Sequence, residues 1–158
     1  MISGEIDCIF SNKPINRFKS KVKNDDKPTK LAHLKREIES IEGCELKSNA
    51  SKLVFADGDH NSQIMIVGEG PGQKEDEIGK PFVGDAGLLL NKMLKAINID
   101  RKKIYITNVV NYRPPNNRKP ETLEITKYSN FLRKHISIIN PKMLILMGST
   151  AMEALFGA

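Results

Sequence analysis

The sequence predicts a single α/β domain built around a parallel sheet, and three observations support this class. Apolar runs at residues 64–67, 104–110 and 143–147 have the length and composition of buried strands. Segments with apolar residues at helical spacing lie between and after these runs. Strand and helix therefore alternate along the chain, which is typical of parallel strands joined by right-handed crossovers. A length of 158 residues suits one domain with one core.

Four helices are expected, and local signals mark their ends. Gly43 would end the first helix, Asp85 would cap the second, and Pro141 follows the third. The fourth begins at Ser149 and continues to Phe156. The apolar residues expected to face the core are Leu31, Leu34, Ile38 and Ile41 in the first helix, Leu90, Met93, Leu94 and Ile97 in the second, and Ile125, Tyr128, Leu132 and Ile139 in the third.

The N-terminal residues 1–29 differ from the rest of the chain. They are of mixed polarity and rich in lysine, so we place the domain at residues 30–158 and interpret residues 19–29 as a flexible linker. The alternatives for this segment are a solvated tail and a basic arm that helps to hold DNA.

The glycine-rich stretch after the first strand is the most informative part of the chain. Open α/β sheets bind ligands at the carboxyl ends of their strands, where this stretch lies. A phosphate cradle is disfavoured because no helix is expected directly after Gly72, no Gly-Lys-Ser/Thr follows, and Glu69 would place a carboxylate where phosphate needs donors. An ordinary surface loop remains an alternative. So does a magnesium site, whose carboxylates would be Glu69, Glu75, Asp76 and Asp85.

A second polar group of residues follows the next strand. Asn108 lies near the carboxyl end of an apolar run, where a buried side-chain amide needs partners. Its amide is either satisfied by the local backbone or offered to a ligand. The loop that follows contains three prolines, which stiffen it, and three cations suited to phosphate: Arg113, Arg118 and Lys119.

Together these segments resemble family 4 uracil-DNA glycosylases. The matching stretches read GEGPGQKEDEIGKPFVGDAG, YITNVVNYRPPNNRKP, EITKYSNFL and NPKMLILMG, in the family's order and at its spacing. The resemblance covers roughly seven-tenths of the chain, from about residue 38 to residue 151. It implies a three-layer α/β sandwich with a central parallel sheet. It also implies excision of uracil from DNA by hydrolysis of the N-glycosidic bond, as in base excision repair.

The resemblance further implies roles for individual residues. Asn108 matches the residue that reads the edge of the flipped uracil, because one amide supplies both a donor and an acceptor. Phe82 matches the aromatic residue that stacks on the base, and Glu69 matches the carboxylate near the glycosidic bond, which would position water and stabilise charge on the sugar. Gly70 and Gly72 would let the backbone approach the ligand. The simpler alternatives are a core phenylalanine for Phe82 and a capping or solvated carboxylate for Glu69.

The chain departs from the family at the metal site. Most members hold a 4Fe-4S cluster on four cysteines, and the aligned positions here carry Ile41, Cys44, Tyr112 and Tyr128. Cys44 and Cys8 cannot supply four thiolates, so we expect no cluster and no metal, with packed side chains in its place. Two lone cysteines also provide no disulfide framework, which suits a reducing cytoplasm.

A second departure concerns the family's C-terminal His-Pro-Ser motif, whose histidine stabilises the departing uracil anion. The sequence reaches Ala158 without it, so we expect the last strand of the family sheet to be missing as well. The histidines present, His33, His60 and His135, are expected on the surface. Two functions therefore stay open: a weakened glycosylase, or a shortened and inactive fragment that binds DNA or has no function.

Charge and hydropathy narrow the partners. A formal net charge of +6 is compatible with a polyanion, although lysine rather than arginine supplies most of it. No run of about 18 apolar residues and no signal-peptide pattern is present. We therefore expect a monomeric cytoplasmic protein that acts on uracil-containing DNA and does not bind membranes.

Overall fold

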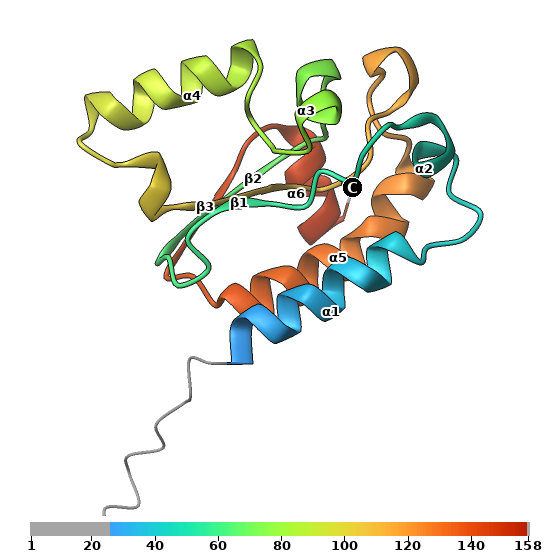
Figure 1. Ribbon diagram of the computed structural model, residues 1–158, viewed down its shortest axis with the longest axis horizontal. Coiled ribbons are helices and arrows are strands. Elements are labelled where there is room, and N and C mark those ends of the chain that lie inside the picture. The colour runs from blue at the N-terminus through green and yellow to red at the C-terminus, as the bar shows by residue number, and fades with distance from the viewer. Residues whose placement is uncertain (1–25, 158) are drawn as a thin grey trace, which may run out of the picture.

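The computed structural model describes residues 26–157, which form a four-stranded sheet with helices on both faces (Figure 1). The elements are α1 (Lys27–Glu39), α2 (Glu45–Asn49), β1 (Asp57–Gly58), β2 (Ile64–Gly68), α3 (Gln73–Ile78), α4 (Asp85–Ala96), the 3-10 turn η2 (Arg101–Lys103), β3 (Tyr105–Asn108), the 3-10 turn η3 (Pro115–Asn117), α5 (Thr122–Ile139), β4 (Met143–Leu146) and α6 (Ser149–Phe156).

The strand order is β1-β3-β2-β4, and the three longer strands are parallel. In the register of β2 and β3, Gly68 lies opposite Asn108, so the two polar segments noted in the sequence meet at one edge of the sheet. The short strand β1, which the sequence did not indicate, pairs with β3 in the antiparallel direction. The predicted α/β class with a mainly parallel central sheet is confirmed.

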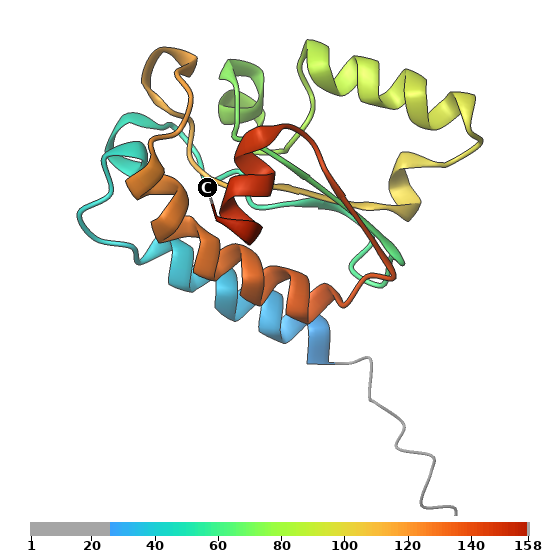
Figure 2. The same ribbon diagram turned by 180° about the vertical axis from the view of Figure 1, so that it is seen from behind.

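The helices form two layers, one on each face of the sheet (Figures 1 and 2). α4 covers one face, where Leu90 and Leu94 pack with Ile66 of β2. On the other face, residues of α1, α5 and α6 pack against Met65 and Val67. Since successive residues of a strand point to opposite faces, both sides of β2 are buried, as its continuous apolar run requires.

The expected core face and end of α5 are confirmed, and the predicted helix at Ser149–Phe156 is α6. All four expected core residues of α5 are buried, and α5 ends at Ile139, just before Asn140 and Pro141. Asn140 has φ of 50° and accommodates the left-handed helix end. At the other end, Glu121 and Glu124 form a reciprocal capping box.

The face of α4 was predicted only in part. Leu90 and Leu94 are buried, whereas Met93 and Ile97 are 55% and 64% exposed. Leu90 and Leu94 share the row that faces the sheet with Gly87, and the neighbouring row lies at the margin of the covered face. The expectation that Asp85 caps the helix is also wrong, since Gly84 is the N-cap.

α1 differs from the expectation at both ends. It begins at Lys27, with Pro28 in its first turn, so residues 27–29 are helical and do not belong to a linker. It ends at Glu39, before Ile41, which packs partly buried against the core. Residues 1–25, with Cys8 and the rest of the expected linker, lie outside the described residues.

His135 was expected on the surface and is instead buried in α5, at 2% exposure. Its Nε2 lies 2.8 Å from the hydroxyl of Tyr105, and its ring stacks on Phe55 at a centroid distance of 4.7 Å. Burial lowers the pKa of His135 to about 4. The position follows Tyr128 and Leu132 at helical spacing, so the pattern did indicate burial.

Within residues 26–157, the search for a helix with the length and hydropathy of a membrane span found none.

Candidate active site

Three segments converge at the carboxyl ends of β2 and β3. A Cβ atom placed on Gly68 would lie 2.5 Å from Asn108 Oδ1 and 2.5 Å from Phe82 Cζ. Only a glycine at this position lets both side chains reach the end of β2. The loop after β2 is tied to β3, because the amides of Val109 and Val110 donate to the carbonyls of residues 68 and 69.

A cavity of about 180 Å³ opens at this junction. Its lining residues are Gly70, Gly72, Glu75, Phe82, Gly84, Asp85, Ala86 and Asn108. The cavity therefore brings together the four residues that the sequence predicted to bind substrate. Phe82 is half-buried, so its ring contributes both to the α4 side of the core and to the cavity wall.

The Asn108 side chain is 3% exposed, and no hydrogen bond found within the described part of the chain uses its amide. Asn111 behaves differently, since its Nδ2 donates to the carbonyls of Val54 and Phe55 at 3.1 and 3.4 Å. Of the two alternatives left open for Asn108, satisfaction by the local backbone is not what the structure shows. The amide instead faces the cavity.

Glu69 is exposed and is not among the residues that line the cavity, although the next residue, Gly70, is. The hydroxyl of Thr150, a fully buried residue in the first turn of α6, donates to Glu69 Oε2. Sequence reasoning missed Thr150, and 81 positions separate it from its partner. No local pattern marks it, because only the return of the chain through β4 brings α6 to the loop after β2.

Two of the proposed magnesium ligands bind backbone amides instead. Glu75 Oε1 accepts from the amides of Val83 and Gly84 at 2.9 and 2.7 Å. Asp76, 3% exposed, accepts from the amides of Ser51 and Lys52. No group of three or more His, Cys, Asp or Glu side chains suited to a metal ion was found in residues 26–157. The geometry therefore does not support the magnesium alternative.

The expectation that no helix directly follows Gly72 is wrong, because α3 begins at the next residue with Gly72 as its N-cap. This six-residue helix escaped detection because its buried residues are Glu75 and Asp76 rather than apolar side chains. Phosphate remains disfavoured here, since the first turn carries two carboxylates whose charge opposes an anion.

The three cations of the basic loop differ in the hydrogen bonds that their side chains make. Both terminal nitrogens of Arg118 donate hydrogen bonds to Glu124, at 2.8 and 2.7 Å, and these bonds lower the pKa of the Glu124 carboxyl. Arg113 donates from Nε to Asn117 Oδ1 at 2.7 Å. Lys119 is exposed, and its ammonium enters no hydrogen bond or ion pair found within the described chain. Arg118 is thus the least available of the three for phosphate.

The four positions aligned with the family's cluster ligands do lie in one hydrophobic cluster, but their side chains do not fit a cluster. Tyr128 is fully buried and its hydroxyl lies 3.4 Å from Cys44 Sγ, while Tyr112 and Ile41 pack in the same core. Burial raises the pKa of both tyrosines. A 4Fe-4S cluster needs thiolate ligands, and only one thiol is present at these positions.

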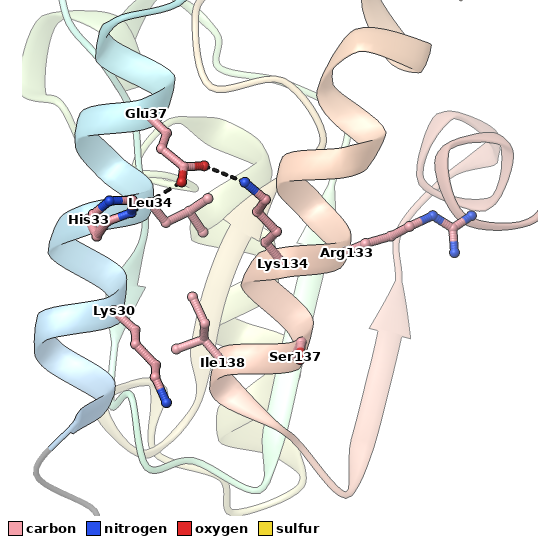
Figure 3. A pocket seen from close by; sticks show the side chains of 8 residues that line it. All are labelled: Lys30, His33, Leu34, Glu37, Arg133, Lys134, Ser137 and Ile138. Atoms are coloured by element: carbon pink, nitrogen blue, oxygen red, sulfur yellow. Dashed lines mark hydrogen bonds and ion pairs between the residues drawn. The ribbon is translucent and has the colours of Figure 1, made fainter.

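A larger cavity, of about 480 Å³, lies between α1 and α5, and none of the predicted site residues lines it (Figure 3). Three of its polar side chains are paired with one another, since Glu37 lies 2.6 Å from the Lys134 ammonium and 3.1 Å from His33 Nδ1. Size alone would favour this cavity. The Asn108 amide, which has no partner in the described chain, and the glycines beside it favour the smaller one.

Comparison with known proteins finds a matching family model and several similar proteins. A family model described as uracil DNA glycosylase superfamily matches residues 55–158. The type-4 uracil-DNA glycosylase of Thermotoga maritima is 42% identical over 116 residues, which are 73% of this chain and 60% of that protein. The type-4 enzyme of Sulfurisphaera tokodaii is 43% identical over 127 residues, 80% of this chain and 58% of that protein.

A different kind of relative is a DNA polymerase of Bacillus phage SP01, 32% identical over 111 residues, which are 70% of this chain and 12% of that protein. The chain spans about three-fifths of the length of the type-4 relatives that it matches. The resemblance to family 4 noted in the sequence is confirmed.

Proposed function

Because the chain belongs to the uracil-DNA glycosylase superfamily, we propose that it removes uracil from DNA by hydrolysing the N-glycosidic bond. The observation that carries this proposal is the 180 Å³ cavity, where the Asn108 amide, which has no hydrogen-bond partner in the described chain, lies beside the aromatic ring of Phe82. The volume is below the roughly 300 Å³ at which sites for drug-sized ligands begin, which suits a single base.

Recognition follows from the chemistry of the two side chains. A base must leave the stack before an enzyme can read its Watson-Crick edge. The Asn108 amide then donates a hydrogen bond from Nδ2 to uracil O4, and its Oδ1 accepts a hydrogen bond from uracil N3–H. The ring of Phe82 stacks on the base, and the glycines at 70 and 72 leave room for it.

Glu69 is the residue to which we assign the catalytic role. Its carboxylate would position the attacking water and stabilise the positive charge that develops on the sugar. The hydroxyl of Thr150 orients the carboxylate, since it donates to Oε2 and leaves Oε1 available to water.

The proposed partner is uracil-containing DNA, bound by a monomer in the cytoplasm. Lys119 and Arg113 are the cations best placed to contact phosphate, because the Arg118 guanidinium already binds Glu124. Such contacts would make affinity fall with salt.

We also propose that the chain functions without an iron-sulfur cluster. The supporting observation is that Tyr112, Tyr128 and Ile41 pack around Cys44 at the positions aligned with the cluster ligands. The purified protein should therefore contain no stoichiometric iron and be colourless. Iron in a one-to-four ratio of protein to metal, with visible thiolate-to-iron absorption, would contradict this.

A second candidate function is binding of DNA without turnover. The observation that favours it is that no histidine of the described chain lines the cavity, while the family uses a histidine to stabilise the departing base. His135 is buried beside Tyr105, and His33 lies on α1. Loss of one such donor typically costs about a hundred- to a thousand-fold in rate.

One experiment separates the two candidates. The chain, in excess over a labelled single-stranded oligonucleotide with one uracil, is followed by alkaline cleavage in a single turnover. We expect slow excision by the parent, a further loss of about a hundred-fold in Glu69→Gln, and parental rates in the control Glu77→Gln, an exposed residue of α3. Folded protein that binds the oligonucleotide but cleaves no more than buffer would favour the second candidate.

A further inference from the structure

The loop that carries Phe82 holds an unfavourable backbone conformation. Phe82 has φ of 54°, in the left-handed region that bulky L residues avoid. Such a conformation persists only where surrounding contacts impose it, and it is found preferentially at ligand sites. The contacts that impose it here are therefore informative about the cavity.

Arg101 provides one set of contacts. Its Nη2 donates to the carbonyl of Pro81 at 2.7 Å, and its Nη1 donates to the carbonyl of Phe82 at 2.8 Å. The guanidinium is held in turn by Asn91 Oδ1 of α4 at 3.0 Å and by Asp57 Oδ2 of β1 at 3.4 Å. One planar cation thus connects the loop to a helix and to the edge of the sheet.

Glu75 provides a second set of contacts, on the following residues. Its carboxylate accepts from the amides of Val83 and Gly84, so consecutive peptide groups on both sides of the Phe82 side chain are bound. Gly87 of α4 closes the remaining side, because a Cβ there would lie 2.0 Å from the Phe82 carbonyl oxygen. The loop can neither relax toward α4 nor turn away from it.

From these contacts we infer that Arg101 is a positioning residue that holds the ring of Phe82 opposite the Asn108 amide. The inference rests on the proposed function, in which those two groups bind the flipped base. Arg101 does not line the cavity, and it acts through the backbone of residues 81 and 82. Lysine can replace it only in part, since an ammonium lacks the planar fork that reaches two carbonyls and two side-chain oxygens together.

The structural part of the inference is tested by hydrogen exchange, which needs no activity. In Arg101→Gln, the amides of Val83 and Gly84 should exchange at least tenfold faster than in the parent, with Arg101→Lys intermediate, while Ile106 in β3 keeps its protection. Lys102→Gln, an exposed neighbour in the same turn, is the control and should match the parent. Parental exchange at residues 83 and 84 in Arg101→Gln would overturn the inference.

The functional part is tested by a double-mutant cycle on single-turnover excision. Arg101→Gln should slow excision at least tenfold in the parent and less than threefold in a Phe82→Ala background. Equal losses in the two backgrounds would show that Arg101 does not act through Phe82 and would overturn the inference alone. If the folded parent neither excises uracil nor prefers uracil-containing DNA, the proposed function is wrong. The role of Arg101 in base binding is then wrong as well, even where hydrogen exchange shows that Arg101 holds the loop.

Discussion

Two regions of the molecule align with functional regions of the family, and they differ in the contacts that their side chains make. At the carboxyl ends of β2 and β3, the cavity keeps Asn108 without a hydrogen-bond partner in the described chain. Around Cys44, the positions aligned with the cluster ligands are filled by packed side chains, among them the fully buried Tyr128. Under the proposed function, base recognition in this fold would not require a metal cluster.

The physical difference between the regions is the state of their polar groups. No fully buried side-chain nitrogen or oxygen of the described residues lacks a partner, so the Asn108 amide, which has none in the described chain, is open to the cavity, where a ligand could bind it. In the packed region the Tyr128 hydroxyl lies 3.4 Å from Cys44 Sγ, and burial of the rings stabilises the fold. Substitutions in the cavity should therefore mainly change function, and substitutions in the packed region should mainly change stability.

The largest expected effect is in the packed region. Tyr128→Ala removes a fully buried ring and should lower the free energy of unfolding by about 3–5 kcal/mol, as large-to-alanine changes in cores do. Tyr128→Phe, the matched control, loses only the contact with Cys44 and should cost about 1 kcal/mol. Urea unfolding measures both. A Tyr128→Ala protein with the parental midpoint would show that this ring does not hold the region together.

The pH dependence of stability gives the next largest effect. The pKa of His135 is lowered to about 4 in the folded chain, below the unfolded value of about 6.5. Protonation therefore favours unfolding, and stability should fall by up to about 3 kcal/mol as the pH is lowered from 6.5 to 4. Urea unfolding between pH 4 and 7 measures this, with His135→Gln as comparison. Equal slopes against pH in parent and variant would contradict the assignment.

Asn108 and Asn111 should respond to the same substitution in opposite ways, one in uracil selection and the other in stability. Asn108→Asp replaces the donor to uracil O4 by an acceptor and should reduce uracil selection by about 1–3 kcal/mol with little change in unfolding. Asn111→Asp loses its bonds to the carbonyls of Val54 and Phe55 and should lower stability while selection is kept. Affinity for uracil- against thymine-containing oligonucleotides, together with urea unfolding, tests both. The same phenotype in both variants would remove the distinction between the two amides.

The smallest expected effect concerns the basic loop. Lys119→Ala should reduce the slope of log affinity for single-stranded DNA against log salt by about 0.7, the value for one phosphate contact. Arg118→Ala should change that slope less, because its guanidinium binds Glu124. Titrations at several salt concentrations measure the slopes. A larger change in Arg118→Ala would mean that the guanidinium leaves Glu124 to bind phosphate.

Much of the site could be predicted from the sequence, because its residues lie in recognisable order within two segments. Asn108, Phe82, Gly70 and Gly72 were each proposed from local context and the family resemblance, and the cavity brings them together. Their roles in binding remain predictions. The availability of the basic residues was harder to predict, since the pairing of Arg118 with Glu124 depends on where α5 begins.

The sequence by itself determined the three parallel strands, the buried face of α5 and the motifs at the strand ends, because these depend on local periodicity and on residue types at fixed spacing. Only the tertiary structure decided which polar side chains already form hydrogen bonds within the fold. Glu75 accepts hydrogen bonds from the backbone amides of Val83 and Gly84, and Arg118 binds Glu124. The contact between Arg101 and Phe82 joins residues 19 positions apart, and that between Thr150 and Glu69 joins residues 81 apart. Such contacts depend on how the sheet and its crossovers assemble, which no local pattern specifies.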